Sequence, residues 1–387
     1  MTTLITGGAG FIGSNIADAL LASGQPVHIY DALQRPGVER NLAWLQSRHG
    51  NRVQATVADI RDQDRLAHAA RAAASVIHLA AQVAVTTSLV DPLADFETNV
   101  AATVRLLEAS RAHRPRFLFA STNKVYGDLG DLAFAVRDDA YAPLDADIAA
   151  HGIDESRSLD FHTPYGCSKG AADQYVLDYA RSYGVPATVF RMSCVYGQRQ
   201  MGTEDQGWVA HFLIRALTGE PITMFGDGRQ VRDVLDVSDV VAAYMRALGS
   251  PNTAGRAFNL GGGPRNAVSL RQLLAYMEGL LGRAPATTYE DWRAGDQRWF
   301  VADARAARAA LGLDAFRGWK EGIAALAEWL RAERAPSPSL PSVAFPSPGS
   351  GEGGREARST LPPAGGGICG AQRSKGEGAR APVEALS

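Results

Sequence analysis

Short runs of hydrophobic residues alternate with longer amphipathic segments along the first half of the chain. The short runs are rich in β-branched and apolar residues, which is typical of buried strands, and they span residues 4–6, 27–30, 53–57, 76–79, 117–120 and 188–190. The longer segments repeat small or apolar residues every three or four positions, which predicts helices over residues 12–22, 65–73, 95–112 and 165–183. This alternation predicts an α/β fold with a doubly wound parallel sheet.

The pattern loosens after about residue 191 into glycine-rich loops around Gly197, Gly226 and residues 261–263. We expect a smaller interleaved substrate-binding lobe, with a ligand cleft between it and the sheet. The predicted division is residues 1–191 and about 231–262 for the nucleotide-binding domain, and about 192–230 and 263–333 for the smaller lobe. Glycine, proline and serine make up 26 of the 53 residues after Arg334, so residues 334–387 are predicted to be a disordered tail.

Composition and charge narrow the classes of partner. The net charge is −2 and the basic residues are scattered, so we expect a small-molecule partner and neither nucleic acid nor a membrane. The three cysteines have no disulfide or metal-binding spacing, so no metal site is predicted. The first glycine is Gly7, which leaves no room for a signal peptide, and no apolar run reaches about 18 residues. We therefore expect a cytoplasmic protein.

A glycine-rich segment follows the first predicted strand. Gly7, Gly10 and Gly13 recur at three-residue intervals, directly after the strand and at the start of a predicted helix. In this position the first glycine forms a tight turn, the second lets backbone amides approach a pyrophosphate, and the third allows close packing of helix and strand. The segment predicts a dinucleotide site; a glycine-rich turn without a ligand is the alternative.

An acidic residue follows the second predicted strand. Asp31 lies 18 residues beyond Gly13, where a carboxylate accepts hydrogen bonds from the adenosine ribose hydroxyls and repels a 2′-phosphate. This favours NAD over NADP, although Arg35 nearby weakens the inference because an arginine accommodates that phosphate. Asp59 follows the third strand and is a candidate for contact with the adenine, with loop capping as the alternative.

Small residues after the fourth strand, in Leu79-Ala80-Ala81, fit a place where backbone passes close to a cofactor. The remaining predicted cofactor-binding residues are Phe11, Ile12, Ile60, Leu79, Ala80, Ala81 and Asn99, together with Tyr165 and Lys169.

A threonine, a tyrosine and a lysine form the predicted catalytic group. Thr122 ends the fifth strand at the carboxyl edge of the sheet, where ligands bind. Tyr165 and Lys169 are four positions apart on a predicted helix, so their side chains share one face. Thirty-five of the 39 basic residues are arginines, so a lysine at 169 indicates a need for a compact ammonium beside the tyrosine. Tyr165 is therefore predicted to be a general base and Lys169 its activator.

With the glycine segment and these three residues, the chain resembles the extended short-chain dehydrogenase/reductase superfamily over about residues 1–332. The resemblance implies a Rossmann-like fold and an NAD cofactor. It also implies that Thr122 orients a sugar hydroxyl whose proton Tyr165 takes while hydride passes to NAD. Ionising Tyr165 near pH 7 requires about three pKa units, or roughly 4 kcal/mol, from Lys169 and the positive nicotinamide. Self-association through the helix that contains Tyr165 is a further implication of the resemblance.

Four strings look closely like the CDP-paratose 2-epimerases, also called CDP-tyvelose epimerases. They are residues 121–128, 160–175, 205–209 and 230–235. The resemblance implies inversion at C2 of a CDP-linked deoxyhexose, a step of O-antigen synthesis. NAD would take hydride from C2, the keto sugar would turn over in the cleft, and hydride would return to the other face.

The chain differs from the sequence patterns of two other enzyme classes in the superfamily, the dehydratases and the 4-epimerases. Relatives that dehydrate nucleotide sugars carry Asp and Glu where this chain has Asn123 and Lys124, which disfavours a 4,6-dehydratase. Many extended members carry Asn in the loop that holds Cys194, and a Cys cannot donate two amide hydrogens to a phosphate. This disfavours a UDP-hexose 4-epimerase without excluding it. An NAD-sensing scaffold is the alternative from another class.

A turning intermediate requires an anchor, and the diphosphate of a nucleotide-diphosphate sugar supplies one. Guanidinium groups pair bidentately with phosphate oxygens. Arg232 and Arg298 match arginines that bind the diphosphate in family relatives, and Arg199 is our own additional candidate. A solvated surface charge is the alternative for each. Asn123 and Lys124 are further substrate-binding candidates, with a structural ion pair as the alternative for Lys124.

Overall fold

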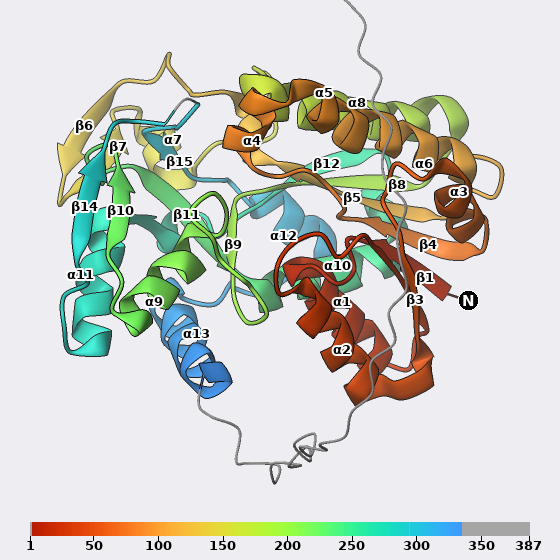
Figure 1. Ribbon diagram of the computed structural model, residues 1–387. Coiled ribbons are helices and arrows are strands. Elements are labelled where there is room, and N and C mark those ends of the chain that lie inside the picture. The colour runs from red at the N-terminus through yellow and green to blue at the C-terminus, as the bar shows by residue number, and fades with distance from the viewer. Residues whose placement is uncertain (1, 294, 335–387) are drawn as a thin grey trace, which may run out of the picture. The chain divides into compact units, whose positions relative to one another are not determined.

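A seven-stranded parallel sheet forms the centre of the structure, which is a computed structural model that describes residues 2–293 and 295–334 (Figure 1). The strand order is β12-β8-β5-β4-β1-β2-β3. The strands are β1 (Thr2–Thr6), β2 (Val27–Asp31), β3 (Val53–Val57), β4 (Ala73–His78), β5 (Arg116–Thr122), β8 (Ala187–Met192) and β12 (Arg256–Leu260). Order and direction confirm the predicted doubly wound, Rossmann-like α/β fold.

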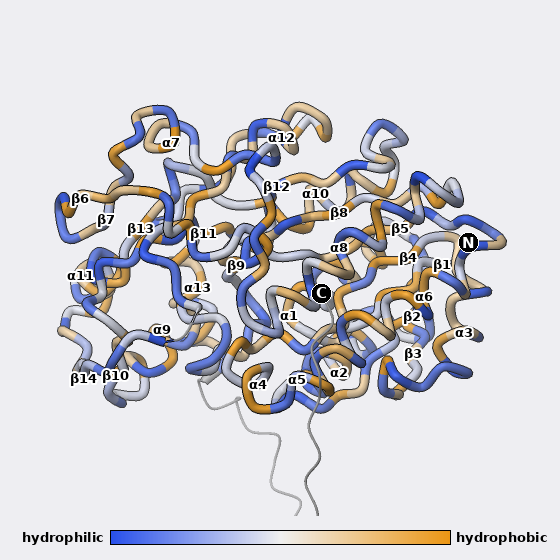
Figure 2. The backbone as a smooth tube through the Cα atoms, turned by 90° about the horizontal axis from the view of Figure 1, so that it is seen from above, coloured by the Kyte–Doolittle hydropathy of each residue, from blue (hydrophilic) through white to orange (hydrophobic). Residues whose placement is uncertain are grey.

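Helices cover both faces of this sheet (Figure 1). One layer is formed by α1 (Phe11–Ala22), α2 (Val38–His49) and α10 (Val237–Gly249), and the other by α3 (Gln63–Arg71), α6 (Ala102–Ser110) and α8 (Thr163–Tyr183). Because both faces are covered, strands read as continuous hydrophobic runs, and Leu4, Ile5, Val76 and Ile77 have no exposed surface. Figure 2 shows the hydrophobic stretches along β4 and β8 inside more hydrophilic outer loops.

One predicted helix has an irregular centre. The segment expected to be a single helix over residues 95–112 consists of α5 (Pro92–Phe96), a π-helical turn (Glu97–Ala101) and α6. A π turn inserts an extra residue that a 3.6-residue pattern does not reveal. Asn99 lies in this turn, so the irregularity determines where its side chain points.

The smaller lobe contains a second sheet in which β11 (Val231–Asp236) pairs with β9 (Cys194–Tyr196), β13 (Ala267–Ser269) and β15 (Trp299–Phe300). Its helices α9 (Trp208–Thr218), α11 (Leu270–Leu281) and α13 (Trp319–Arg334) contribute to a separate hydrophobic core. Within the predicted nucleotide-binding range 231–262, β12 and α10 belong to the large sheet and its layers, whereas β11 lies in the second sheet. The domain boundaries remain a prediction.

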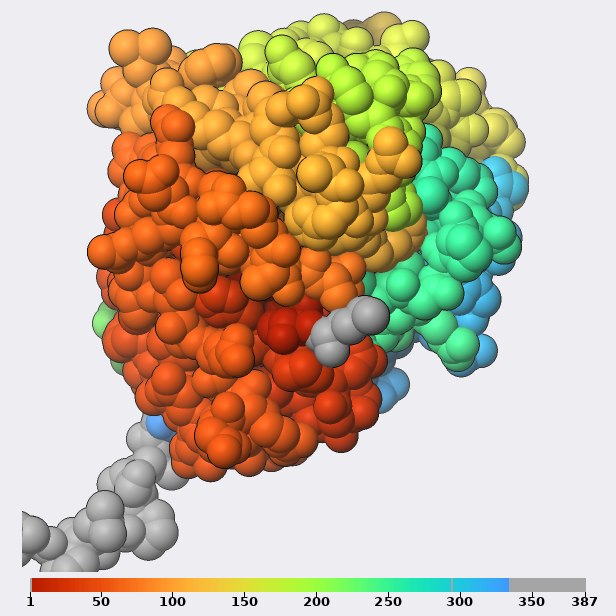
Figure 3. Space-filling view, turned by 90° about the vertical axis from the view of Figure 1, so that its right-hand side faces the viewer, coloured from red at the N-terminus to blue at the C-terminus, as the bar shows by residue number. Residues whose placement is uncertain are grey.

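Short elements complete the described part of the chain. They are α4 (Val85–Val90), α7 (Ala146–His151), α12 (Arg305–Leu311), the paired strands β6 (Phe134–Arg137) and β7 (Ala140–Pro143), the paired strands β10 (Ile222–Phe225) and β14 (Thr287–Glu290), and the 3₁₀ turns Gly50–Arg52, Asn123–Tyr126, Pro251–Thr253 and Pro264–Asn266. Figure 3 shows the face on which the red to orange N-terminal residues lie beside the yellow-green helix α8. None of the described helices is long and apolar enough to cross a membrane. The predicted tail lies outside the described residues, except for Arg334 at the end of α13.

Candidate active site

A cavity of about 640 Å³ opens at the carboxyl ends of β1, β2, β4 and β5 and continues along the smaller lobe. Its position is the one expected for ligands of an open parallel sheet. It brings together most of the predicted site residues. Those on its wall are Gly7, Gly10, Phe11, Ile12, Gly13, Asp31, Asp59, Ile60, Leu79, Ala80, Ala81, Thr122, Asn123, Lys124, Tyr165, Lys169, Arg199 and Arg232.

The glycine segment has the geometry of a diphosphate site. Gly7 has φ +70°, and a Cβ there would lie 2.7 Å from the backbone nitrogen of Ala80. A Cβ on Gly13 would lie 2.3 Å from the carbonyl oxygen of Gly7, so α1 approaches the loop as closely as predicted. Gly10 is the N-cap residue of α1, and no side chain caps this end of the helix. The free end of the helix dipole can therefore receive an anion, and these residues fit a dinucleotide.

The two acidic candidates lie on the same side of the cavity. Asp31 Oδ2 accepts a hydrogen bond from Ala9 N at 3.0 Å, and Oδ1 accepts one from Leu33 N at 2.9 Å. Asp59 accepts hydrogen bonds from the guanidinium of Arg61 at 2.9 and 2.7 Å, and these bonds hold the pKa of Asp59 below its ordinary value. Asp59 thus has the loop role that we considered, and it also lines the cavity.

Asn99 does not line the cavity; it is 1% exposed. Its Oδ1 accepts a hydrogen bond from Gln82 N, and its Nδ2 donates one to Gln82 O, both at 2.9 Å. The segment from Leu79 to Ala81, which does line the cavity, ends at this Gln82. Asn99 therefore acts on the cofactor wall through the backbone rather than by contact.

The three predicted catalytic residues meet on one wall. Thr122 ends β5, and the hydroxyls of Thr122 and Tyr165 interact. Tyr165 lies in the first turn of α8, where its backbone N donates to Ser88 Oγ at 3.1 Å. Lys169, one turn later, donates from Nζ to the carbonyl oxygen of Ala120 at 2.5 Å. These contacts fix both helix residues against the end of β5.

Burial shifts the pKa of both Tyr165, the predicted base, and Lys169, its predicted activator. It raises the pKa of Tyr165 to about 12, and the hydrogen bond with Thr122 acts in the opposite direction. It lowers the pKa of Lys169 to about 8, whereas the carboxylates of Asp173 and Asp95 favour the ammonium. Burial of Tyr165 thus favours its neutral hydroxyl over the phenolate.

Asp173 also belongs to a buried ion pair. Its carboxylate receives two hydrogen bonds of 3.0 Å from the guanidinium of Arg191, and Ser121 Oγ donates to it at 2.8 Å. Asp173 has no exposed surface, and it is one turn beyond Lys169 on α8. The pair joins α8 to β8, one helical turn from Lys169.

The substrate side of the cavity contains Asn123, Lys124 and Arg232. Lys124 Nζ donates to Gly295 O at 3.1 Å and to Gln297 Oε1 at 3.3 Å, and burial lowers the pKa of Lys124 to about 8. Arg232 pairs with Asp296 at 2.5 Å. Asn123 is buried and accepts a hydrogen bond from Thr122 Oγ1 at 3.4 Å.

Two of the arginines predicted to bind the substrate diphosphate do not lie where that role requires. Arg298 is exposed, does not line the cavity, and has its guanidinium 5.7 Å from the centre of the Tyr141 ring. Arg199 lines the cavity, but its guanidinium stacks 3.9 Å from the centre of the Trp44 ring and 5.5 Å from that of Trp329. These contacts favour a structural role for Arg199, and the exposed position of Arg298 offers no contact with a ligand in the cavity.

Sequence reasoning missed two cavity arginines, Arg61 beside Asp59 and Arg293 in the smaller lobe. Arg293 lines the cavity, stacks 3.6 Å from the centre of the Phe225 ring and pairs with Glu204 at 2.7 Å. In a chain with 35 arginines its residue type carries no signal, and its neighbourhood is formed by segments far apart in the sequence.

Comparisons with known proteins show the family of this chain. Residues 3–261 match the model of the "NAD dependent epimerase/dehydratase family". The chain is 42% identical to CDP-paratose 2-epimerase of Salmonella typhi over 339 residues, which cover 85% of this chain and 99% of that one. It is 34% identical to UDP-glucose 4-epimerase of Mycolicibacterium smegmatis, covering 86% and 99%.

A solved structure has the same fold. It is UDP-glucuronic acid 4-epimerase of Bacillus cereus in complex with UDP-glucuronic acid and NAD, with a TM-score of 0.74 at 27% identity, covering 86% of this chain and 100% of that one. The predicted resemblance, the NAD cofactor and the class of NAD-dependent nucleotide-sugar epimerase are confirmed. The chain belongs to the NAD dependent epimerase/dehydratase family.

Proposed function

We propose that the protein inverts C2 of a CDP-linked deoxyhexose and converts CDP-paratose to CDP-tyvelose by transient oxidation. The observation that carries this proposal is the 42% identity to CDP-paratose 2-epimerase over 99% of that protein. Asn123 and Lys124 support it, because neither side chain supplies the carboxylate pair that a 4,6-dehydratase requires. NAD, when bound, accepts hydride from C2 and returns it.

The residues of the cavity have separate roles in this reaction. Tyr165 takes the proton of the C2 hydroxyl as C2 loses hydride, and it gives the proton back when C2 is reduced from the other face. Lys169 stabilises the phenolate, and Thr122 orients the hydroxyl. The glycine segment binds the cofactor diphosphate, and Asp31 accepts hydrogen bonds from the ribose hydroxyls. Each oxidation at C2 is reversed by one reduction, so the cofactor is not consumed.

Turnover of the keto sugar requires that the nucleotide end stays bound. Arg232 and Arg293 lie on the cavity wall in the smaller lobe and are the proposed diphosphate anchors. Lys124 is proposed to contact the sugar, because its ammonium has three donors and the two contacts to Gly295 and Gln297 occupy two of them. The proposed assembly remains a homo-oligomer, and the proposed location remains the cytoplasm.

Nuclear magnetic resonance of product mixtures tests the proposal. Purified protein is incubated with CDP-paratose or with a UDP-hexose, and the expected result is a change of configuration at C2 of the CDP-sugar without exchange of the C2 hydrogen with solvent. Inversion at C4 of a UDP-hexose, with the CDP-sugar unchanged, would contradict this proposal and identify a UDP-hexose 4-epimerase. The 34% identity to UDP-glucose 4-epimerase supports that alternative.

A further inference from the structure

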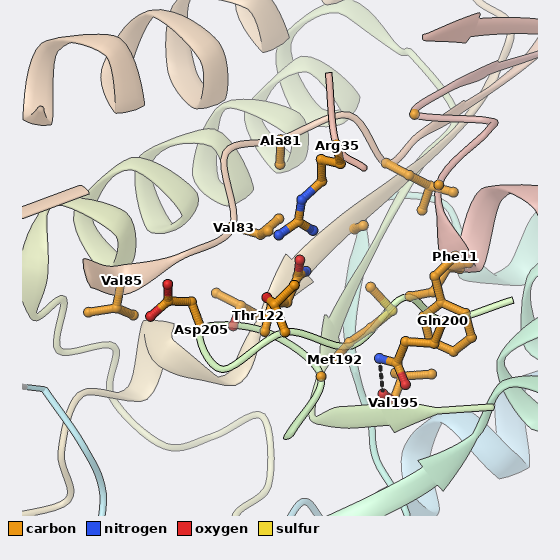
Figure 4. A pocket seen from close by; sticks show the side chains of 18 of the residues that line it. Phe11, Arg35, Ala81, Val83, Val85, Thr122, Met192, Val195, Gln200 and Asp205 are labelled. Atoms are coloured by element: carbon orange, nitrogen blue, oxygen red, sulfur yellow. Dashed lines mark hydrogen bonds between the residues drawn. The ribbon is translucent and has the colours of Figure 1, made fainter. Parts of the chain in front are cut away.

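One basic side chain of the cavity has no partner. Seven arginine and lysine side chains line the cavity, and six of them have a hydrogen bond or an ion pair with protein. The six are Arg61, Lys124, Lys169, Arg199, Arg232 and Arg293. Within residues 2–293 and 295–334, the guanidinium of Arg35 has no hydrogen bond, ion pair or stacking contact. Figure 4 shows its side chain directed into the cavity, on the side of Ala81 and Val83.

The environment of Arg35 favours an anion. The surrounding protein removes part of the water from the guanidinium, which lowers the pKa of Arg35, and the carboxylate of Asp205 acts in the opposite direction. Asp205 is already engaged, because Thr86 Oγ1 donates to it at 3.0 Å and Arg293 lies 3.7 Å away. Arg35 is exposed and faces the cavity with its guanidinium unpaired, and guanidinium groups pair bidentately with phosphate oxygens.

The loop that carries Arg35 is fixed against the glycine segment. It connects Asp31, at the end of β2, to α2. In the second turn of α2, Asn41 Nδ2 donates to the carbonyl oxygen of Ala9 at 3.1 Å, within the glycine segment. Gly37 (φ +89°) brings the same loop next to Met201, because a Cβ on Gly37 would lie 2.7 Å from Met201 Cγ. The loop that carries Arg35 thus starts at the proposed ribose site, and α2 at its other end is hydrogen-bonded to the glycine segment.

We propose that Arg35 binds the diphosphate of the dinucleotide and retains the cofactor through the reaction cycle. The glycine segment offers backbone N–H groups and a helix N-terminus but no basic side chain, so the two negative charges of a diphosphate would otherwise lack a cation. The other possible anion is a 2′-phosphate on the ribose. The carboxylate of Asp31 at the ribose position opposes that anion.

Retention of the cofactor has a chemical reason. If the reduced cofactor left before the second hydride transfer, the sugar would remain a ketone. The nicotinamide loses its positive charge on reduction, whereas the diphosphate keeps its charge. A residue that binds the diphosphate therefore stabilises the oxidised and the reduced cofactor to the same extent. A residue that acts at the nicotinamide does not.

The test compares cofactor affinity in three variants. Wild type, R35Q and R35K are freed of co-purified nucleotide, and the Kd values for NAD and NADH are measured by titration without any sugar. R35Q is expected to raise both Kd values by a similar factor, on the order of 10- to 100-fold, and R35K by less. R40Q is the matched control, because Arg40 is on α2, outside the cavity, and pairs with Glu333 at 3.1 Å. The melting temperature without nucleotide should be the same in all of them.

Three outcomes would overturn the proposal. They are Kd values of R35Q equal to those of wild type, weaker binding of only NADH or only NAD, and loss of weak NADP binding while NAD binding stays the same. The last outcome assigns Arg35 to a 2′-phosphate. Because no sugar takes part, the result does not depend on which carbon the enzyme inverts.

Discussion

Asn99 and Gln82 are joined by two hydrogen bonds of 2.9 Å, one in each direction between the Asn99 amide and the Gln82 backbone. The pair resembles one rung of a sheet in which a side chain replaces the neighbouring strand. It holds the end of the segment from Leu79, which forms part of the cofactor wall. The position of this wall therefore depends on a residue that does not itself line the cavity.

Asn99→Leu should destabilise the protein and weaken NAD binding. Two backbone groups of Gln82 lose their partners in a half-buried environment, which costs about 1–3 kcal/mol for each group that water cannot reach. Urea unfolding and NAD titration measure the two effects. Asn51→Leu is the control, because Asn51 is exposed. Equal stability of the two variants would contradict the role of Asn99.

Tyr165→Phe should slow turnover strongly and leave the fold intact. The substitution removes only the hydroxyl, and loss of a general base costs about 100- to 10,000-fold in rate. Turnover is measured with the substrate that the wild type inverts, and circular dichroism checks the fold. A rate within a few-fold of wild type would exclude Tyr165 as the base.

Lys169→Met should change how stability depends on pH. Burial lowers the pKa of Lys169 to about 8, so between pH 8 and about 10.5 the unfolded lysine holds its proton while the folded lysine has lost it. The free energy of unfolding of wild type therefore rises with pH through this window. Relative to that of the variant, the rise is on the order of 3 kcal/mol. Urea unfolding of both proteins at pH 7.5 and pH 10.5 measures the gain.

The chain offers an independent check on this lysine. It has only four lysines, so selective ¹³C labelling of lysine side chains gives few signals, and comparison with Lys169→Met identifies one of them. The signal of Lys169 should titrate near pH 8. Parallel stability curves, or titration of this signal near its ordinary value, would show that the ammonium is well solvated.

Asp173→Asn should destabilise the protein and further lower the pKa of Lys169. The variant leaves the buried guanidinium of Arg191 without its counter-charge, which typically costs about 3–5 kcal/mol. It also removes a carboxylate that favours the Lys169 ammonium. Urea unfolding and the lysine titration measure the two effects. Asp178→Asn is the control on the same helix, because Asp178 is half exposed. If Asp173→Asn lowered the free energy of unfolding as little as Asp178→Asn does, the prediction would be wrong.

Local spacing was sufficient to predict the centre of the site. Gly7, Gly10 and Gly13 are required by a backbone turn of fixed geometry, and Tyr165 and Lys169 share a face because a helix has 3.6 residues per turn. These residues are only a few positions apart, so their spacing depends on the local turn or helix and not on the rest of the fold. The parallel sheet followed in the same way from the alternation of strands and helices.

Contacts between residues that are distant in the sequence could not be predicted from it. Asp173 gave no signal, because its partner Arg191 lies 18 positions away on a different element. The π turn at residues 97–101 changes the direction of Asn99, and the hydrophobic pattern does not encode it. Arg298 and Arg293 are five positions apart in an arginine-rich chain, and only the folded loop decides which of them lines the cavity.

The stacking of Arg199 between Trp44 and Trp329 has a consequence for the order in which the protein is made. One ring belongs to α2, in the first eighth of the chain, and the other to α13, the last described helix. During translation the early sheet can form long before the second tryptophan leaves the ribosome. The wall at Arg199 is therefore one of the last parts of the enzyme to be completed, and a nascent chain that stalls before residue 329 carries it unfinished.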